Sequence, residues 1–302
     1  MSPTPPNIAG RSTAEVKPLF VLGVPRSGTT FLQQVLDAHP EIFVSDELRA
    51  VAWLVRETHR LREGFPVHGT PYPVNYGPEF ADYLLNNANW IIYAFYRSQA
   101  KRSGKPAIRY WGDKFPHYDE VLHLLPRLFP QPRFVIIHRD LRDIVCSLNT
   151  GHQWNAERSA PYACLIFGRY MQKIDGLVRE GTVPAEHIIH VDYLDFHANA
   201  EAEAGRIFAA LELDYPPATA ERVRELRDIQ SHSIRRPGGK ATRFDISRSQ
   251  SRWERDLSPD DLDFVLTEIA RIQDAVAIGN RLKPGEPFLY PPPSHPGEAD
   301  SA

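Results

Sequence analysis

The stretch that decides the fold is residues 19–30, which read Leu-Phe-Val-Leu-Gly-Val-Pro-Arg-Ser-Gly-Thr-Thr. Its first four residues form an apolar run closed by a glycine, a pattern typical of a buried parallel strand. Apolar residues then recur at helical spacing until a His-Pro pair at 39–40 interrupts them. We therefore expect a strand, a glycine-containing loop and a helix in succession.

The glycines of this loop, Gly23 and Gly28, have the five-residue separation of a phosphate-binding P-loop. Such a turn directs backbone N–H groups and a helix N-terminus at one anion. A nucleoside-triphosphatase has a lysine at the position of Thr29. The cation of this loop is instead Arg26, whose rigid, planar guanidinium group is suited to binding oxyanions. The spacing predicts a phosphate site that works without a metal ion. An ordinary strand-to-helix turn is the alternative.

A second anion-binding pattern follows the apolar run at 134–137. Arg139 leaves the carboxyl end of this expected strand, the end at which ligands of open α/β sheets collect. Ser147 lies eight residues further on, about two turns into the next helix, so both side chains can face one phosphate. The alternative for Arg139 is a surface ion pair with Asp140 or Asp143.

Strand and helix patterns alternate over the rest of the chain. This order predicts an α/β, P-loop-like three-layer fold with a central parallel sheet of about five strands flanked by helices. The last helix is expected to be capped by Ser258, to begin at Pro259 and to stop at Gly279. The other expected elements are strands near 42–44 and 188–191 and helices near 47–62, 79–102, 141–150, 159–180 and 199–212.

Composition divides the chain into three parts. Residues 1–16 are rich in Pro, Ser and Thr and are expected to form a flexible N-terminal arm. Residues 284–302 are expected to form a Pro-rich C-terminal tail. Between them, residues 17–283 are expected to form one domain, since a chain of 302 residues can bury a substantial core.

Charge and cysteine content exclude several classes of protein. Lys and Arg number 35 against 38 Asp and Glu, a net charge of −3, so no general basic field favours nucleic acid as a partner. Two cysteines are too few for a disulfide framework and fit a reducing compartment. The sequence shows no transmembrane segment and no secretion signal. We therefore expect a cytoplasmic protein.

The loop at 25–30, together with Arg139 and Ser147, resembles the sulfotransferases that use 3′-phosphoadenosine 5′-phosphosulfate (PAPS). Its arginine form is most similar to the bacterial and tyrosylprotein-type branch, and the resemblance extends over most of residues 17–260. It implies that the loop holds the 5′-phosphosulfate and that Arg139 and Ser147 hold the 3′-phosphate. The cofactor-binding residues that it implies are Arg26, Ser27, Gly28, Thr29, Thr30, Arg139, Ser147, Tyr193, Ser251 and Arg252.

Two later segments carry part of this resemblance. Residues 191–195, Val-Asp-Tyr-Leu-Asp, are similar to a Tyr-Glu-Asp segment whose tyrosine lies near the adenine, with Leu194 in place of the glutamate. Residues 251–253, Ser-Arg-Trp, resemble a segment that closes over the cofactor, although the glycines of the cytosolic branch are missing. The alternative for Tyr193 is an ordinary core aromatic at a strand end.

The resemblance also implies catalytic residues. Glu47, in Asp-Glu-Leu-Arg at 46–49, corresponds to the proposed base of the tyrosylprotein branch, and Arg49 is expected to orient the acceptor substrate or the carboxylate. Lys114 and Arg26 are expected to stabilise the transferring sulfuryl group, and His117 is a rival base. The alternatives are a favourable charge near a helix N-terminus for Glu47, a solvated loop charge for Lys114 and a capping or packing role for His117.

The resemblance implies a sulfotransferase that moves the sulfuryl group of PAPS to a hydroxyl acceptor by metal-free in-line transfer, with adenosine 3′,5′-bisphosphate (PAP) as product. A small molecule, a sugar and a phenol or tyrosine are equally compatible acceptors, and no pattern indicates the oligomeric state. The alternatives are a P-loop nucleotide-dependent kinase, against which the missing lysine argues, and a non-catalytic nucleotide-binding module.

Overall fold

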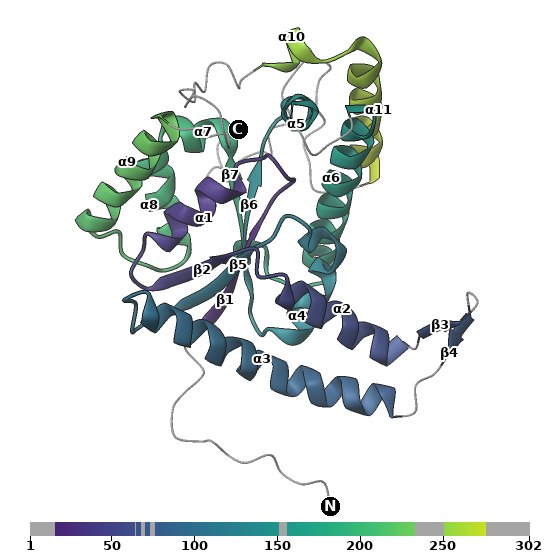
Figure 1. The fold of residues 1–302 in the computed structure, drawn as a ribbon, viewed down its shortest axis with the longest axis vertical. Helices are drawn as coiled ribbons and strands as arrows, with labels where there is room; N and C mark the ends of the chain where they lie inside the picture. The colour runs from purple at the N-terminus through teal and green to yellow at the C-terminus, as the bar shows by residue number, and fades with distance from the viewer. Residues whose placement is uncertain are drawn as a thin grey trace, which may run out of the picture.

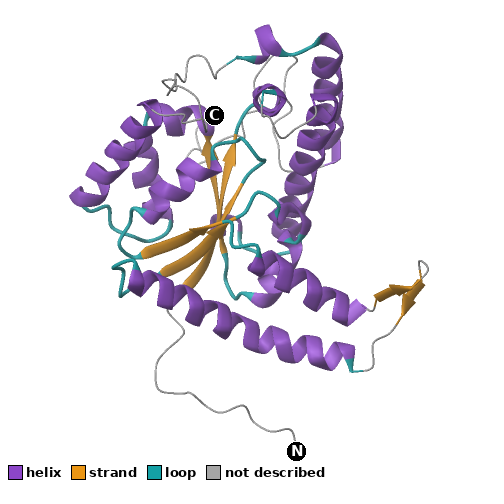
Figure 2. Cartoon of the chain, in the orientation of Figure 1, coloured by secondary structure: helices purple, strands orange, loops and turns teal. Residues whose placement is uncertain are grey.

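A central sheet of five parallel strands runs through the molecule (Figures 1 and 2). The computed structural model describes residues 16–63, 65–67, 70–72, 76–150, 156–232 and 251–275. The predicted three-layer α/β fold is confirmed. In sheet order the strands are β2 (Ile42–Asp46), β5 (Tyr110–Lys114), β1 (Lys17–Leu22), β6 (Arg133–His138) and β7 (Ile188–Asp192), and a separate antiparallel pair consists of β3 (Phe65–Val67) and β4 (Thr70–Tyr72).

Alternate residues of the central strands face opposite sides of the sheet, so each strand contributes to two cores. In β1, Phe20 and Leu22 pack into one core, whereas Leu19 and Val21 pack into the other. All four side chains are fully buried. Burial on both faces explains why the strand reads as a continuous apolar run rather than as an alternating pattern.

Helices cover both faces of the sheet, as Figure 2 shows. One core lies under α2 (Ala50–Glu63), α3 (Gly77–Arg102), α4 (Leu125–Leu128), α5 (Leu141–Asn149), α6 (Ala156–Arg179) and α11 (Pro259–Ala275). The other lies under α1 (Thr29–Asp37), α7 (Tyr193–Ala198), α8 (Ala200–Ala210) and α9 (Pro217–His232). The short elements are α10 (Trp253–Asp256), which contacts α5, and 3₁₀ turns at Tyr118–Glu120, Leu122–Leu124 and Ala185–His187.

Two helices differ from the sequence-based expectation. The helix expected near 47–62 begins only at Ala50, because Glu47 has a φ of 53°, a left-handed conformation that a helix does not accommodate. The helix expected near 199–212 is preceded by the separate helix α7. This extra helix forms because the carboxylate of Asp192, the last residue of β7, accepts hydrogen bonds from the backbone N–H groups of Leu194 and Asp195.

The start of the last helix agrees with the sequence. The Ser258 hydroxyl accepts a hydrogen bond from the backbone N–H of Asp261 at 3.2 Å, and Pro259 is the first residue of α11. Such capping satisfies an N–H group that has no partner inside the helix. The expected stop at Gly279, the C-terminal tail and residues 1–15 of the N-terminal arm lie outside the described residues.

The strand β5 was not predicted from the sequence. It reads Tyr-Trp-Gly-Asp-Lys, and the charged residues at its end break the apolar pattern by which the other strands are recognised. All five of its residues are nevertheless buried, because it lies between β2 and β1. Its backbone approaches β1 closely at Gly112, which pairs with Leu19.

Replacing Gly112 by alanine should test this packing. A Cβ atom at Gly112 would lie 2.1 Å from the carbonyl oxygen of Leu19, so we expect the free energy of unfolding to fall by about 3 kcal/mol or more. The matched control is Gly176→Ala in α6, where the nearest side-chain atom would be 3.9 Å away and alanine should raise stability by about 1 kcal/mol. Urea denaturation measures both. Equal stability of Gly112→Ala and the unsubstituted chain would contradict the pairing of β1 with β5.

Candidate active site

The carboxyl ends of the five parallel strands meet at one edge of the sheet, and each end carries one residue of the predicted site. Lys114 is the last residue of β5, and Arg139 directly follows β6. Glu47 directly follows β2, and Tyr193 directly follows β7. The loop containing Arg26 follows β1. The topology therefore gathers residues that are far apart in the sequence.

The loop between β1 and α1 has a backbone that two glycines make possible. A Cβ atom at Gly23 would lie 2.6 Å from the Oγ atom of Ser27, and one at Gly28 would lie 3.0 Å from the Tyr193 ring. Gly28 has a φ of 99° and Arg26 a φ of 76°, so Arg26 adopts the left-handed region with a full side chain. Such backbone strain concentrates at functional sites.

The N-terminus of α1 is arranged to receive an anion. No side chain caps the helix at Gly28, and its first turn contains no acidic residue. The first N–H groups of a helix have no partner within it and carry partial positive charge. The Ser27 hydroxyl beside them is fully buried and has no hydrogen-bond partner among the described residues. Thr29 is buried and Thr30 exposed at the helix start. These groups fit the phosphosulfate that the sequence implies.

Two arginines, a serine and a tyrosine come together beside this loop. The Nε atom of Arg26 donates to the Ser147 hydroxyl at 3.2 Å, and Nη1 of Arg139 donates to the Arg26 carbonyl oxygen at 2.8 Å. The Arg139 guanidinium lies 4.5 Å from the centre of the Tyr193 ring. Burial and the charge of Arg139 lower the pKa of Arg26. The two anion-binding patterns therefore form one continuous site.

The segment at 251–253 closes against the helix that carries Ser147. The Asp143 carboxylate in α5 accepts hydrogen bonds from the backbone N–H groups of Ser251 and Trp253, each at 3.1 Å. The Trp253 ring lies 3.9 Å below the Arg142 guanidinium. The Arg252 side chain forms an ion pair with Asp256 within its own short helix. The segment thus lies next to the predicted 3′-phosphate site.

A lysine and two carboxylates form the other half of the site. The Lys114 ammonium lies 2.6 Å from an oxygen of Asp46 and 2.9 Å from an oxygen of Glu47, and its side chain is only 3% exposed. The Glu47 backbone N–H donates to the Lys114 carbonyl oxygen at 2.7 Å. The Nη2 atom of Arg49 lies 3.7 Å from the second carboxylate oxygen of Glu47. Glu47 is therefore held on three sides in its left-handed conformation.

Asp113 is a residue of this site that sequence reasoning missed. Its fully buried carboxylate accepts hydrogen bonds from the Ser45 hydroxyl at 2.6 Å, the Leu48 backbone N–H at 2.9 Å and the Tyr118 hydroxyl at 2.7 Å. Burial raises its pKa to about 6 despite these donors. Ser45 and Leu48 flank the Asp46–Glu47 pair, so Asp113 fixes the chain on both sides of the predicted base. Its position beside Lys114 was the only signal in the sequence.

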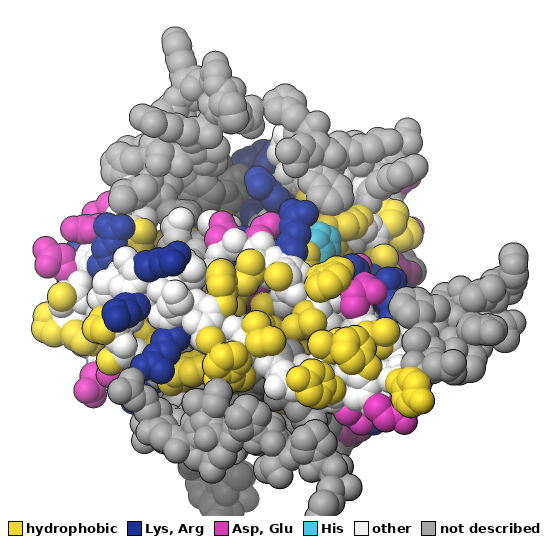
Figure 3. Space-filling model, turned by 60° about the horizontal axis from the view of Figure 1, so that its bottom comes forward, with side chains coloured by type: hydrophobic (Ala, Val, Ile, Leu, Met, Phe, Trp, Pro, Cys, Tyr) yellow, Lys and Arg dark blue, Asp and Glu magenta, His cyan; other side chains and the backbone are white. Residues whose placement is uncertain are grey.

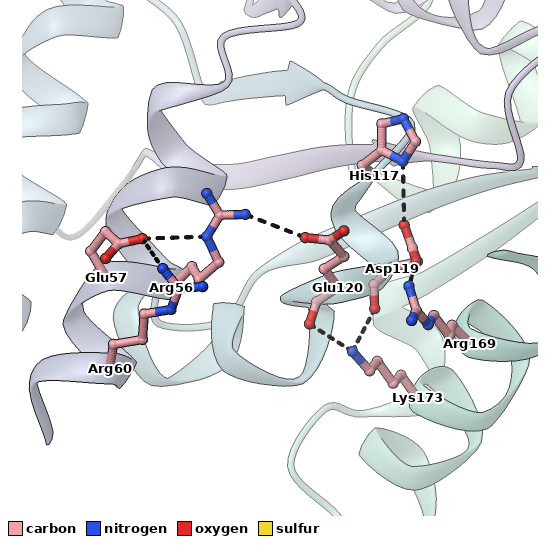
Figure 4. Close-up of polar contacts among 8 residues, drawn as sticks. All are labelled: Arg56, Glu57, Arg60, His117, Asp119, Glu120, Arg169 and Lys173. Atoms are coloured by element: carbon pink, nitrogen blue, oxygen red, sulfur yellow. Dashed lines mark hydrogen bonds and ion pairs between the residues drawn. The ribbon is translucent and has the colours of Figure 1, made fainter. Parts of the chain in front are cut away.

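His117 lies in a different environment from Glu47. Its Nε2 atom is 3.3 Å from the Tyr162 hydroxyl, and its Nδ1 atom is 4.0 Å from the buried carboxylate of Asp119. Figure 4 shows that Asp119 also faces Arg169 of α6. The ring belongs to a polar network between the chain after β5 and α6, which fits the packing role weighed for it.

The remaining reactive side chains point to no further chemistry. The two cysteines of the chain, Cys146 and Cys164, are buried, and burial raises their pKa values to about 11 and about 12. Both are therefore poor nucleophiles. Within the described ranges, no group of three or more His, Cys, Asp or Glu could hold a metal ion. No helix in those ranges is long and apolar enough to cross a membrane.

The fold and the loop define a P-loop-like α/β protein, and comparison with known proteins identifies the family. A family model described as "Sulfotransferase family" matches residues 18–217. This match spans more than half of the chain, and the chain therefore belongs to the sulfotransferase family.

A curated relative agrees with this assignment, and a solved structure has a similar fold. The chain is 32% identical over 176 residues to "Protein-tyrosine sulfotransferase 2" of Gallus gallus, which covers 53% of this chain and 45% of that protein. The chain thus spans less than half the length of this relative. The sulfotransferase domain of the Synechococcus PCC 7002 olefin synthase has a similar fold, with a TM-score of 0.52 and 21% identity over 85% of this chain and 96% of that one.

The Asp113 carboxylate should leave a signature in the pH dependence of stability. Its pKa is raised above the ordinary value of 3.8 to about 6 in the folded chain, so the native state binds the proton more tightly than the unfolded state. The stability that this proton contributes is lost as pH rises through about 6. We expect Asp113→Asn to lack this decline in urea denaturation measured between about pH 4 and pH 7.

Two further measurements test the role of the Asp113 carboxylate. Asp113→Ala removes the acceptor of the Leu48 N–H and of the buried Tyr118 hydroxyl, and one partner of Ser45, and should lower the free energy of unfolding by about 3 kcal/mol at neutral pH. Parallel pH profiles for Asp113→Asn and the unsubstituted chain would show that Asp113 does not titrate in this range.

Proposed function

We propose that this chain transfers the sulfuryl group of PAPS to a hydroxyl-bearing acceptor. The observation that carries the proposal is the convergence of an uncapped helix N-terminus, two arginines and a Lys–Glu pair at one edge of the sheet. The helix N-terminus and the two arginines bind a phosphosulfate and a second phosphate. Lys114 and Glu47 supply an acid and a base. Membership of the sulfotransferase family supports the same reaction.

Bound PAPS supplies a sulfur atom joined to a good leaving group through a bridging phosphate oxygen. Arg26 and the N–H groups at the start of α1 hold the phosphosulfate and neutralise the charge on its outer oxygens. Lys114 has three N–H donors, of which Asp46 and Glu47 engage two. Its third donor is directed to the bridging oxygen, where negative charge grows as the S–O bond breaks.

Glu47 acts as the general base. It accepts the proton of the acceptor hydroxyl while the acceptor oxygen forms its bond to sulfur, and PAP departs with the electron pair of the broken bond. Glu47 is 36% exposed, so an acceptor can reach its carboxylate, and Arg49 beside it orients the acceptor. General-base assistance of this kind contributes about 10²–10⁴ to a rate.

Arg139, Ser147 and Tyr193 bind the nucleotide end of the donor. Arg139 and Ser147 contact the 3′-phosphate, and the Tyr193 ring lies beside the adenine. The backbone of Ser251 and the Arg252 side chain complete the wall of this subsite, since Asp143 holds their segment against α5. The kinase alternative is not favoured, because no lysine follows Gly28.

The acceptor is an alcohol or phenol whose identity is left to experiment. A relative named as a protein-tyrosine sulfotransferase supports a tyrosine-like phenol as the first acceptor to test. The test is the formation of PAP from PAPS with phenols, sugars and a tyrosine peptide, measured by mass spectrometry with and without EDTA. We expect PAP and a sulfated acceptor under both conditions. Failure with every acceptor despite tight PAP binding would favour a non-catalytic module.

The choice of base is tested by Glu47→Gln. This variant keeps the shape of the side chain and removes the proton acceptor, so kcat should fall about 10²–10⁴-fold while affinity for PAP is unchanged. His117→Ala is the matched comparison and should retain most of the turnover, because His117 contacts Tyr162 and Asp119 instead. An inactive His117→Ala with a normal Glu47→Gln would reverse the assignment.

The 3′-phosphate contact is tested by Arg139→Ala. Loss of a charge-assisted contact should weaken PAP binding by about 1.5–3 kcal/mol and leave adenosine 5′-phosphosulfate, which lacks the 3′-phosphate, nearly unaffected. Calorimetry measures both ligands, with Arg271→Ala as the control, because Arg271 is exposed on α11 and pairs with Glu268. Equal weakening of both ligands would show that Arg139 has another role.

A further inference from the structure

The first turn of α5 carries a buried carboxylate that holds another segment of the chain. Asp140 caps this helix, because its carboxylate accepts a hydrogen bond from the backbone N–H of Arg142. Asp143, in the first turn, is only 4% exposed. Its two oxygens accept hydrogen bonds from the backbone N–H groups of Ser251 and Trp253, which lie 108 and 110 residues further along the chain. The Asp143 carboxylate therefore serves the distant segment, whereas Asp140 serves the helix.

Arg142 forms a second contact with the same segment. Its guanidinium lies 3.9 Å from the centre of the Trp253 ring. The Asp140 carboxylate fixes this guanidinium, accepting hydrogen bonds from Nε at 3.0 Å and from Nη2 at 2.7 Å. Arg142 is only 3% exposed, and a cation on an aromatic face contributes more when it is removed from water. The first turn of α5 thus binds residues 251–253 through two separate contacts.

This segment carries Arg252 to the predicted 3′-phosphate site. Asp143 and Ser147 are four residues apart and therefore lie on one face of α5. Burial raises the pKa of the Cys146 thiol and the charge of Arg252 acts in the opposite direction, so Arg252 lies close to the residue that precedes Ser147. The short helix α10, which begins at Trp253, contacts α5 (Figure 1). The position of Arg252 beside the nucleotide therefore depends on how its segment is held.

The backbone of Ser251 depends on the contact with Asp143. Its φ of 50° is left-handed. A residue other than glycine keeps such a conformation only where surrounding contacts enforce it. The Ser251 N–H donates to the Asp143 carboxylate, which is one such contact. We therefore expect the segment to leave this conformation when the carboxylate is lost.

We propose that Asp143 is a positioning residue of the nucleotide site, which holds residues 251–253 beside the bound nucleotide and thereby slows its release. Asp143 does not touch the ligand and acts through the backbone of this segment and the position of Arg252. Arg142 and Trp253 support the same arrangement. The inference rests on the proposed function for the identity of the nucleotide, PAPS or PAP.

The first test measures release of a fluorescent PAP analogue from the full chain by stopped-flow displacement with excess PAP. Asp143→Asn keeps the shape of the side chain and replaces one acceptor oxygen by a donor. Release should become about tenfold faster or more, because a hydrogen bond to a charged group is lost, while the association rate changes little. Equal release rates for this variant and the unsubstituted chain would overturn the proposal.

The matched control is Asp175→Asn in α6. Asp175 is also a buried helical carboxylate, 3% exposed, and it pairs with Arg179 one turn further along its own helix. This variant should release the PAP analogue at the rate of the unsubstituted chain. Release accelerated equally by Asp175→Asn and Asp143→Asn would show a general effect of losing a buried charge and would overturn the specific role of Asp143.

The second test separates positioning of the nucleotide from the chemical step. Asp143→Asn should raise KM for PAPS about tenfold without lowering kcat, because Glu47 and Lys114 are unchanged. Glu47→Gln is expected to give the opposite result, a lower kcat with unchanged affinity for PAP. A lower kcat with an unchanged KM in Asp143→Asn would overturn the proposal.

The third test concerns the aromatic contact. Trp253→Ala should accelerate release of the PAP analogue, and Trp253→Phe should restore most of the retention, because an aromatic face remains over Arg142. Trp90→Ala is the control, since Trp90 is 53% exposed on α3, on the side of the molecule where Figure 3 shows exposed hydrophobic side chains. Equal release rates for Trp253→Ala and Trp253→Phe would overturn the supporting role of Arg142.

The closing experiment locates the effect by hydrogen exchange with PAP bound, followed by mass spectrometry. The backbone N–H groups of Ser251 and Trp253 should exchange about tenfold faster or more in Asp143→Asn, whereas those of β6 stay protected. Loss of protection throughout β6 would show that Asp143 supports the fold as a whole and would overturn the proposal. Absence of PAP binding to the unsubstituted chain would overturn the proposed function, whereas normal binding with equal exchange in both chains would overturn only the role of Asp143.

Discussion

Two opposite charges, those of Asp113 and Lys114, are buried at the end of β5, between β2 and β1, and the arrangement of the site depends on their partners. A buried charge is costly unless hydrogen bonds and counter-charges compensate it. Ser45, the Leu48 N–H and Tyr118 compensate the carboxylate, whereas Asp46 and Glu47 compensate the ammonium. Most of these partners lie at the end of β2. The contacts that compensate the buried charges of β5 therefore also fix the position of the predicted base, Glu47.

Backbone strain marks the same region. Arg26, Glu47 and Ser251 are three of the six non-glycine residues with positive φ among the described residues, and each belongs to the predicted site. Left-handed conformations of such residues cost about 1–3 kcal/mol and persist only where surrounding contacts enforce them. At Glu47 these contacts are two backbone hydrogen bonds and the Lys114 ion pair. The strain thus lies in three turns that carry residues of the predicted site.

The sequence predicted the parts of the site that obey simple periodic rules. The strand, loop and helix around Arg26 and the strand before Arg139 follow apolar runs, and the parallel fold then brings them together. β5 was not predicted because its charged residues break that pattern, although all five of its residues are buried. The sequence also suggested that Ser147 acts with Arg139, whereas its hydrogen bond goes to Arg26. The hydrogen-bond partner of a side chain depends on the direction in which that side chain points. The spacing of residues along a helix does not determine this direction.

Contacts within the chain hold the cationic half of the predicted site together. Burial and the neighbouring charge of Arg139 lower the pKa of Arg26, so charged Arg26 needs compensating contacts. The Arg26 carbonyl oxygen and the face of the Tyr193 ring hold the Arg139 guanidinium, and Ser147 holds Arg26. In the proposed site, an anion bound between the two guanidinium groups would offset their repulsion. Affinity then comes from groups already in position, and a ligand that binds only the folded chain also stabilises it.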